Sequence, residues 1–191
     1  ATKKEIKMAI KTLYQYGAKK IILLRCNSSY PAPIEESNLM TIRDMSKLFK
    51  VNIGLSDHTI GFLNSTSAIA LGATVIEKHV TISKNDGGLD SIFSLEIKNF
   101  KKFVEECKNT KKIIGKVYYG ASKREKHSLR YRRSIYISKN INKGEKITKN
   151  NVKIVRPALG LHIKYYEKIL GMRAKKSLKI ADVPKIQILK K

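Results

Sequence analysis

Short apolar runs alternate with helix-forming segments along the first 115 residues, and this alternation restricts the fold more than any other feature. Residues 21–24 (IILL) are too short a run for a helix, and they follow a segment, residues 5–16, whose apolar side chains recur at helical spacing. The same alternation then repeats, which is typical of strand-helix units that build a parallel sheet. Further strands are predicted at residues 51–55 and 74–80, and further helices at residues 39–48, 65–71 and 95–114.

Two local predictions follow from the same runs. Residues 21–24 are apolar without alternation, which favours a strand buried on both faces. Ser94 precedes the long helical segment and is a suitable N-cap, and Gly115 follows its end.

The composition changes after residue 115. Residues 116–133 combine Gly, Ser, Tyr and basic residues without a clean period, which indicates a linker between a first domain (1–115) and a second (134–191). The second domain is predicted to be a small α+β module, with strands at 134–138 and 152–155 and a short helix at 165–170.

The formal net charge is +25, and clustered Lys and Arg side chains could neutralise nucleic-acid phosphates. Here the lysines are spread over nearly every segment, and no recognition helix or aromatic-basic stacking pattern is present. We therefore expect a solvated lysine-rich surface and no nucleic-acid partner. A basic nucleic-acid binder remains an alternative.

The chain has no run of roughly 20 apolar residues, so no membrane span is expected. It shows no secretory leader. Its two cysteines, Cys26 and Cys107, match no Cys/His metal spacing and favour a reduced, cytoplasmic setting over a disulfide scaffold.

Polar residues gather where each predicted strand ends. The first strand leads into Asn27–Tyr30 and the second into Ser56–His58, and the third ends on Glu77, Lys78 and His79. Catalytic groups of parallel barrels come from such carboxyl ends. His58 and His79 would lie on adjacent strands, where two imidazoles with carboxylates and water suit a divalent ion. By spacing alone, both could equally be satisfied polar residues in turns.

Literal strings in this order resemble the sialic acid (nonulosonic acid) synthase family. In the first domain they are YPAP (30–33), GLSDHT (54–59) and GATVIEKH (72–79). In the second domain, RRSI (132–135), KGE (143–145) and RP (156–157) resemble that family's antifreeze-like (SAF) domain. The resemblance implies an α/β fold: the last three βα units of a TIM (β/α)8 barrel, followed by a small SAF domain.

The resemblance also implies a reaction. Enzymes of this family condense phosphoenolpyruvate with an open-chain acetamido sugar and release phosphate, with a divalent metal, most often Mn²⁺ (Mg²⁺ or Co²⁺ are alternatives). By position, the metal ligands are His58 and His79, and Ser28 and Ser56 contact phosphoenolpyruvate. Tyr30, Glu77 and Asp90 bind the sugar, and Glu77 and Asp90 are the candidate catalytic residues. Turn structure at Ser28 and Tyr30, and solvated loop carboxylates at Glu77 and Asp90, are the alternatives.

Arg156 matches a family residue that reaches the partner subunit's site in a domain-swapped homodimer, a role for which a planar guanidinium is suited. Without the resemblance it would be a surface arginine at a strand end. The loop GLDSIFSL (88–95) is more like the pseudaminic acid synthase branch, with N-acetylneuraminate or legionaminate synthesis as alternatives.

The family's first five barrel strands have no counterpart in this chain. We therefore expect the 191 residues alone to lack turnover. A non-catalytic remnant that binds a sugar or a partner subunit is the alternative from a different functional class.

Overall fold

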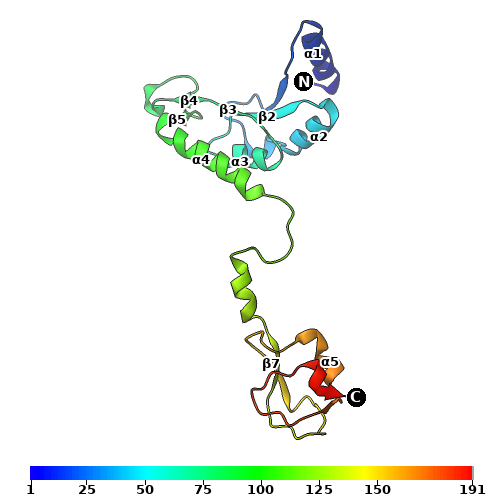
Figure 1. Cartoon of the computed structure of the whole chain (residues 1–191). Helices are drawn as coiled ribbons and strands as arrows, with labels where there is room; N and C mark the ends of the chain where they lie inside the picture. The colour runs from blue at the N-terminus through cyan, green and yellow to red at the C-terminus, as the bar shows by residue number, and fades with distance from the viewer. Residues whose placement is uncertain (191) are drawn as a thin grey trace. The chain divides into compact units, whose positions relative to one another are not determined.

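The computed structural model describes residues 1–190, and Lys191, the last residue of the predicted second domain, lies outside that range. The chain divides into two compact units, Ala1–Val117 and Tyr118–Lys191 (Figure 1). Each unit has its own apolar core. No helix within residues 1–190 is long and apolar enough to cross a membrane.

The first unit is built on a three-stranded parallel sheet in the order β1-β2-β3. The predicted alternation of strands and helices is confirmed. The strands are β1 (Ile22–Cys26), β2 (Asn52–Asp57) and β3 (Ile76–Lys78), and the helices are α1 (Lys3–Gln15), α2 (Met40–Phe49), α3 (Leu63–Ala70) and α4 (Ile97–Ile114).

The core of the first unit lies between the sheet and helices α2 and α3. Ile53 and Leu55 alternate along β2 and are almost fully buried, as is Ile42 of α2. Burying one such side chain contributes about 1.5–3 kcal/mol. Helices α3 and α4 pack against each other along the sheet (Figure 1). Residues 53, 55 and 57 therefore face the helices, and residues 54 and 56 face the opposite way.

Gly54 marks a close approach between β2 and β3. A Cβ at this position would lie 2.5 Å from the backbone oxygen of Val75, a separation that real Cβ atoms do not show. The glycine allows the two strands to pair directly above the polar strand ends.

Three local predictions were wrong. β1 is not buried on both faces, because it is an edge strand and Ile22 is 47% exposed. The predicted third strand is two short ones, because β4 (Val80–Thr81) leaves β3 and pairs in parallel with β5 (Leu95–Glu96). Ser94 does not cap α4: the N-cap residue is Glu96, and the Ser94 hydroxyl donates to the backbone oxygen of Asp90.

The second unit is a small antiparallel module. β6 (Ser134–Ile137) is the centre of a sheet of order β7-β6-β8, with β7 (Val152–Val155) and β8 (Leu161–His162). The unit also contains α5 (Tyr166–Ile169) and the strand pair β9 (Arg173–Ala174) and β10 (Leu189–Lys190). Its core residues include Ile135, Ile137, Ile141, Ile147 and Ile169.

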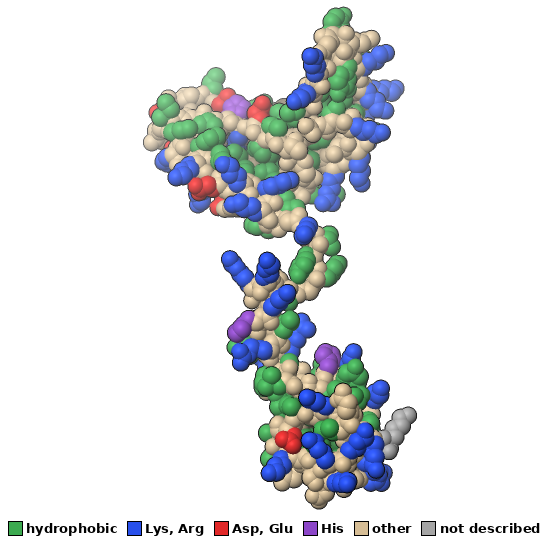
Figure 2. Space-filling view, in the orientation of Figure 1, with side chains coloured by type: hydrophobic (Ala, Val, Ile, Leu, Met, Phe, Trp, Pro, Cys, Tyr) green, Lys and Arg blue, Asp and Glu red, His purple; other side chains and the backbone are tan. Residues whose placement is uncertain are grey.

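The predicted linker, residues 116–133, contains a 3-10 helix, η3 (Glu125–Tyr131). The backbone N–H of Ala158 donates to the backbone oxygen of Arg130, so the end of η3 is hydrogen-bonded to the loop after β7. Lys and Arg side chains are distributed over the visible faces of both units, and acidic side chains are few (Figure 2).

Candidate active site

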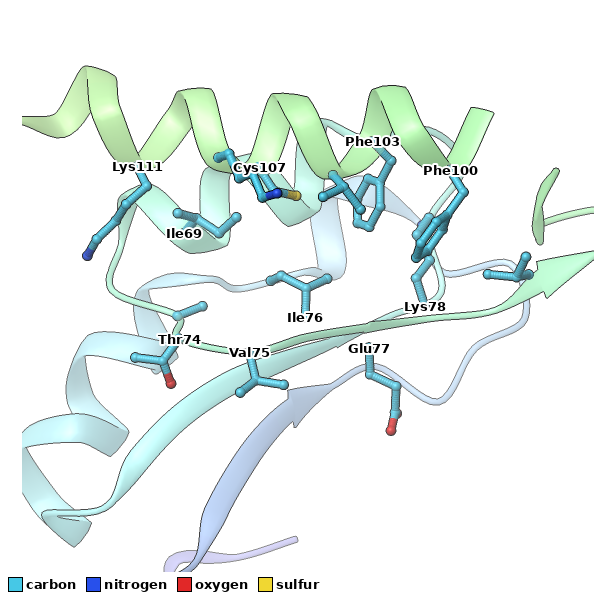
Figure 3. A pocket seen from close by; sticks show the side chains of 14 residues that line it. Ile69, Thr74, Val75, Ile76, Glu77, Lys78, Phe100, Phe103, Cys107 and Lys111 are labelled. Carbon is cyan, nitrogen blue, oxygen red and sulfur yellow. The ribbon is translucent and has the colours of Figure 1, made fainter. Parts of the chain in front are cut away.

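The polar ends of β1, β2 and β3 lie side by side because the strands are parallel and in register. Cys26 pairs with Ser56, and Ser56 pairs with Glu77. Residues paired in this way point to the same face of a sheet. The Ser56 hydroxyl donates to Oε1 of Glu77 over 2.6 Å, and Glu77 points to the side of β3 away from α4 (Figure 3).

The two predicted histidines follow directly after β2 and β3, and the structure brings them together. The ring centroids of His58 and His79 are 5.1 Å apart. The ring of Tyr30, from the loop after β1, lies 4.3 Å from that of His58 and 6.2 Å from that of His79. Side chains from the ends of three strands thus form one cluster.

Each imidazole has a partner at Nδ1. Nδ1 of His58 lies 2.8 Å from the backbone oxygen of Asn27, and Nδ1 of His79 lies 3.5 Å from Oδ2 of Asp90. Because a carbonyl or carboxylate oxygen accepts, Nδ1 carries the hydrogen and the lone pair of Nε2 is left for another ligand. Metal-binding histidines in proteins are commonly oriented by such a contact.

The other predicted residues lie at different places. Asp90 is in the loop between β4 and β5 and joins the cluster through His79. Ser28 is exposed, with its Oγ 3.8 Å from Sγ of Cys26 at the end of β1. Arg156 is exposed and directly follows β7 in the second unit.

A buried polar network on the helix-facing side of the sheet was not predicted. Asp57 and Lys78 form an ion pair of 3.0 Å between Oδ2 and Nζ, and their side chains are almost completely buried. The carboxylate of Asp57 also accepts hydrogen bonds from Asn64, Ser65 and Thr59. The two-residue period of β2 could have revealed this network, since it places residue 57 on the same face as Ile53 and Leu55.

The pKa of Asp57 lies below its ordinary value. Burial raises this pKa, but hydrogen bonds from Asn64 and Ser65, the charge of Lys78 and the backbone N–H of Thr59 together lower it more. Asp57 is therefore an ionised, fully partnered group that fastens β2 to β3 and α3. Its donors leave little capacity for a substrate.

The donor set of the cluster fits a divalent ion in part. Two imidazoles with free Nε2 lone pairs suit Mn²⁺, Co²⁺ or Zn²⁺, and the remaining positions would fall to oxygen donors. Among residues 1–190, no group of three or more His, Cys, Asp and Glu side chains is close enough to hold a metal ion by itself. The protein would thus supply two ligands and leave the other positions open.

A groove of about 1040 Å³ lies along the outer edge of β3. Its walls are residues 73–78, Val80, Ile69 of α3 and one side of α4, from Phe100 to Lys111 (Figure 3). β3 pairs only with β2, so this edge has no strand partner among the described residues. Most of the lining is apolar, including Phe100, Phe103 and Val75.

Comparison with known families identifies the fold and the cluster. The NeuB family profile matches residues 1–119, which contain all three strands and both histidines. The chain belongs to the NeuB family. Residues 132–183 match the SAF domain, so the predicted resemblance is confirmed in both units.

Relatives within the NeuB family include synthases of two sugar acids. The chain is 41% identical over 185 residues to "Pseudaminic acid synthase" of Helicobacter pylori and 40% identical over 178 residues to "N,N'-diacetyllegionaminic acid synthase" of Campylobacter jejuni. These alignments cover 96% and 92% of this chain and 54% and 53% of the relatives. The chain thus spans about half the length of these NeuB proteins.

The fold is shared with solved structures of this group. A putative spore coat polysaccharide biosynthesis protein E from Chromobacterium violaceum superposes with a TM-score of 0.64 at 23% identity, over 100% of this chain and 58% of that protein. This likeness supports the mixed α/β architecture of the chain.

Proposed function

We propose that this chain carries one side of the active site of a nonulosonic acid synthase, which condenses phosphoenolpyruvate with an open-chain acetamido sugar. The paired imidazoles at the ends of β2 and β3 carry the proposal, because Asn27 and Asp90 orient both rings and leave both Nε2 atoms free. The synthase names of the relatives support the same reaction class.

His58 and His79 would hold a divalent metal ion, with Mn²⁺ as the first choice and Mg²⁺ or Co²⁺ as alternatives. When bound, such an ion supplies Lewis-acid polarisation of a carbonyl oxygen. The exposed ring of Tyr30 and the carboxylates of Glu77 and Asp90 surround the histidines, and they would bind the hydroxyls of the sugar.

The reaction forms one carbon-carbon bond and uses one water. The methylene carbon of phosphoenolpyruvate attacks the sugar aldehyde, whose oxygen takes up a proton. Water then adds to the former enol carbon, and phosphate leaves with the oxygen that linked it. Ser56 and Ser28 would contact phosphoenolpyruvate at the ends of β2 and β1. Glu77, held by the Ser56 hydroxyl, and Asp90 are the candidate proton carriers.

The barrel is proposed on the open edges of the sheet. β1 and β3 each have one free edge, and free edges pair readily with further strands. The apolar groove beside β3 would receive a strand and its side chains, as closure of a (β/α)8 barrel requires. The three βα units would then be its last three.

The proposed assembly is a homodimer in which the SAF domain reaches the partner subunit. Arg156 is exposed at the end of β7, and its guanidinium would contact the acetamido group of the sugar in the partner's site. Within this class we favour pseudaminic acid synthesis, based on the loop at residues 88–95. Legionaminic and N-acetylneuraminic acid synthesis are the alternatives.

A chimera tests this function. The amino-terminal half of the Helicobacter pylori pseudaminic acid synthase is joined ahead of Ala1 and assayed with phosphoenolpyruvate, Mn²⁺ and that enzyme's sugar substrate. We expect phosphate release and a nine-carbon product. We also expect a loss of at least ~100-fold in His58→Ala and His79→Ala, since each removes half of the protein's metal ligands. The exposed His127→Ala is the matched control and should keep full turnover.

The opposite results distinguish the alternatives. Turnover that survives both histidine substitutions would contradict the proposed metal site. A folded chimera that binds the sugar without Mn²⁺ and forms no product would instead support a non-catalytic binding module.

A further inference from the structure

We propose that Phe93 is a positioning residue that fixes the two imidazoles at the angle and separation a shared metal ion needs. This inference rests on the proposed function of His58 and His79. It adds a residue that contacts both rings and that neither the strand-end pattern nor the family resemblance pointed out.

The ring of Phe93 lies against the whole cluster. Its centroid is 5.2 Å from that of His79, 6.3 Å from that of His58 and 5.6 Å from that of Tyr30. The plane of Phe93 is at 90° to that of His58 and at 63° to that of His79, both edge-to-face geometries that aromatic pairs prefer. Phe93 is only 4% exposed, whereas Tyr30 is 53% exposed. Phe93 is thus the buried support of the cluster.

The backbone beside Phe93 is tied to one of the two histidines. The N–H of Leu95 donates to the backbone oxygen of His79 over 2.8 Å, as part of the β4–β5 pairing. Ser94 donates through both its N–H and its hydroxyl to the backbone oxygen of Asp90. The loop that carries Phe93 therefore also positions Asp90, the partner of His79.

The two histidines depend on Phe93 to different degrees. His58 is buried, has a 2.8 Å contact at Nδ1 and is also approached by Sγ of Cys26 at 3.9 Å. His79 is more exposed, and its only polar partner among the described residues is the exposed Asp90 at 3.5 Å. Packing against Phe93 is then the main restraint on the ring of His79. Without it the two Nε2 atoms would converge less often.

The experiment is a Co²⁺ titration of the 191-residue chain, followed by visible absorption, in wild type, Phe93→Leu and Phe103→Leu. Phe103 is the matched control: it is 5% exposed and packs against Phe62 and Phe100, away from the histidines. We expect Phe93→Leu to weaken Co²⁺ binding at least ~10-fold and to change the absorption bands of the remaining complex. Phe103→Leu should change affinity less than ~2-fold.

Unchanged Co²⁺ affinity and bands in Phe93→Leu would overturn the role of Phe93 while leaving the metal site intact. Equal losses in Phe93→Leu and Phe103→Leu would also overturn it, because they would reflect general destabilisation. A wild-type chain that binds no Co²⁺ would contradict the proposed metal site and, with it, this role.

Discussion

Adjacent residues at the ends of β2 and β3 serve opposite purposes on the two faces of the sheet. On the helix-facing side, Asp57 and Lys78 are buried, paired and surrounded by donors. On the other side, Ser56 and Glu77 are joined by one hydrogen bond, and the neighbouring histidines keep their Nε2 atoms free. A one-residue step along a strand thus separates a group whose partners are all protein atoms from one that can still take a ligand.

The largest test of this contrast is removal of one buried partner. In Lys78→Met, the carboxylate of Asp57 stays buried without its counter-ion, which should lower the free energy of unfolding of the first unit by about 3–5 kcal/mol. Lys98→Met is the matched control, because its ion pair with Glu96 is largely exposed and should cost at most about 1 kcal/mol. Urea denaturation measures both. Equal, small losses would show that the buried network is not a fastening.

Acid should weaken the same network next. Because the folded-state pKa of Asp57 is lowered, its contribution to stability is complete above the unfolded value of about 3.9 and disappears as pH falls through the lower folded value. Urea midpoints measured from pH 6 to pH 2.5 should fall more steeply below pH 4 in wild type than in Asp57→Asn. Asp44→Asn, at an exposed ion pair, should follow wild type. Parallel curves for wild type and Asp57→Asn would contradict the lowered pKa.

The smallest effect compares two serines, one on each face. Ser65 is fully buried and donates to Oδ2 of Asp57, so Ser65→Ala should cost about 1.5–3 kcal/mol. Ser56→Ala removes a bond to the exposed Glu77 and should cost about 1 kcal/mol or less. In the chimera, the order should reverse for the KM of phosphoenolpyruvate, which should rise more in Ser56→Ala. If Ser65→Ala raised the KM more, the two faces would not be separated as described.

The sequence predicted the elements that rest on periodicity. The alternation of strands and helices, the parallel sheet and the short strand at 152–155 all follow from repeating apolar positions. β1 was misjudged because four consecutive apolar residues predict burial only where neighbours cover both faces. The N-cap of α4 was misplaced because Ser94 bonds to Asp90 within the β4–β5 loop, a contact that no local pattern encodes.

The candidate site was predicted to the same limit. Polar strand ends predicted that His58 and His79 would be neighbours, since parallel strands align their carboxyl ends. The hydrogen bond from His58 to Asn27 and the packing of Phe93 depend on loop geometry, so the sequence could not give them. Phe93 was passed over because a phenylalanine in a loop offers no polar signal.

The most direct test of the central claim is an anomalous-scattering measurement on crystals of the chain grown with Mn²⁺. The account predicts one strong manganese peak within coordination distance of Nε2 of both His58 and His79, with the Nδ1 atoms still facing Asn27 and Asp90. A manganese peak elsewhere, coordination through Nδ1, or no peak at the two histidines would contradict it.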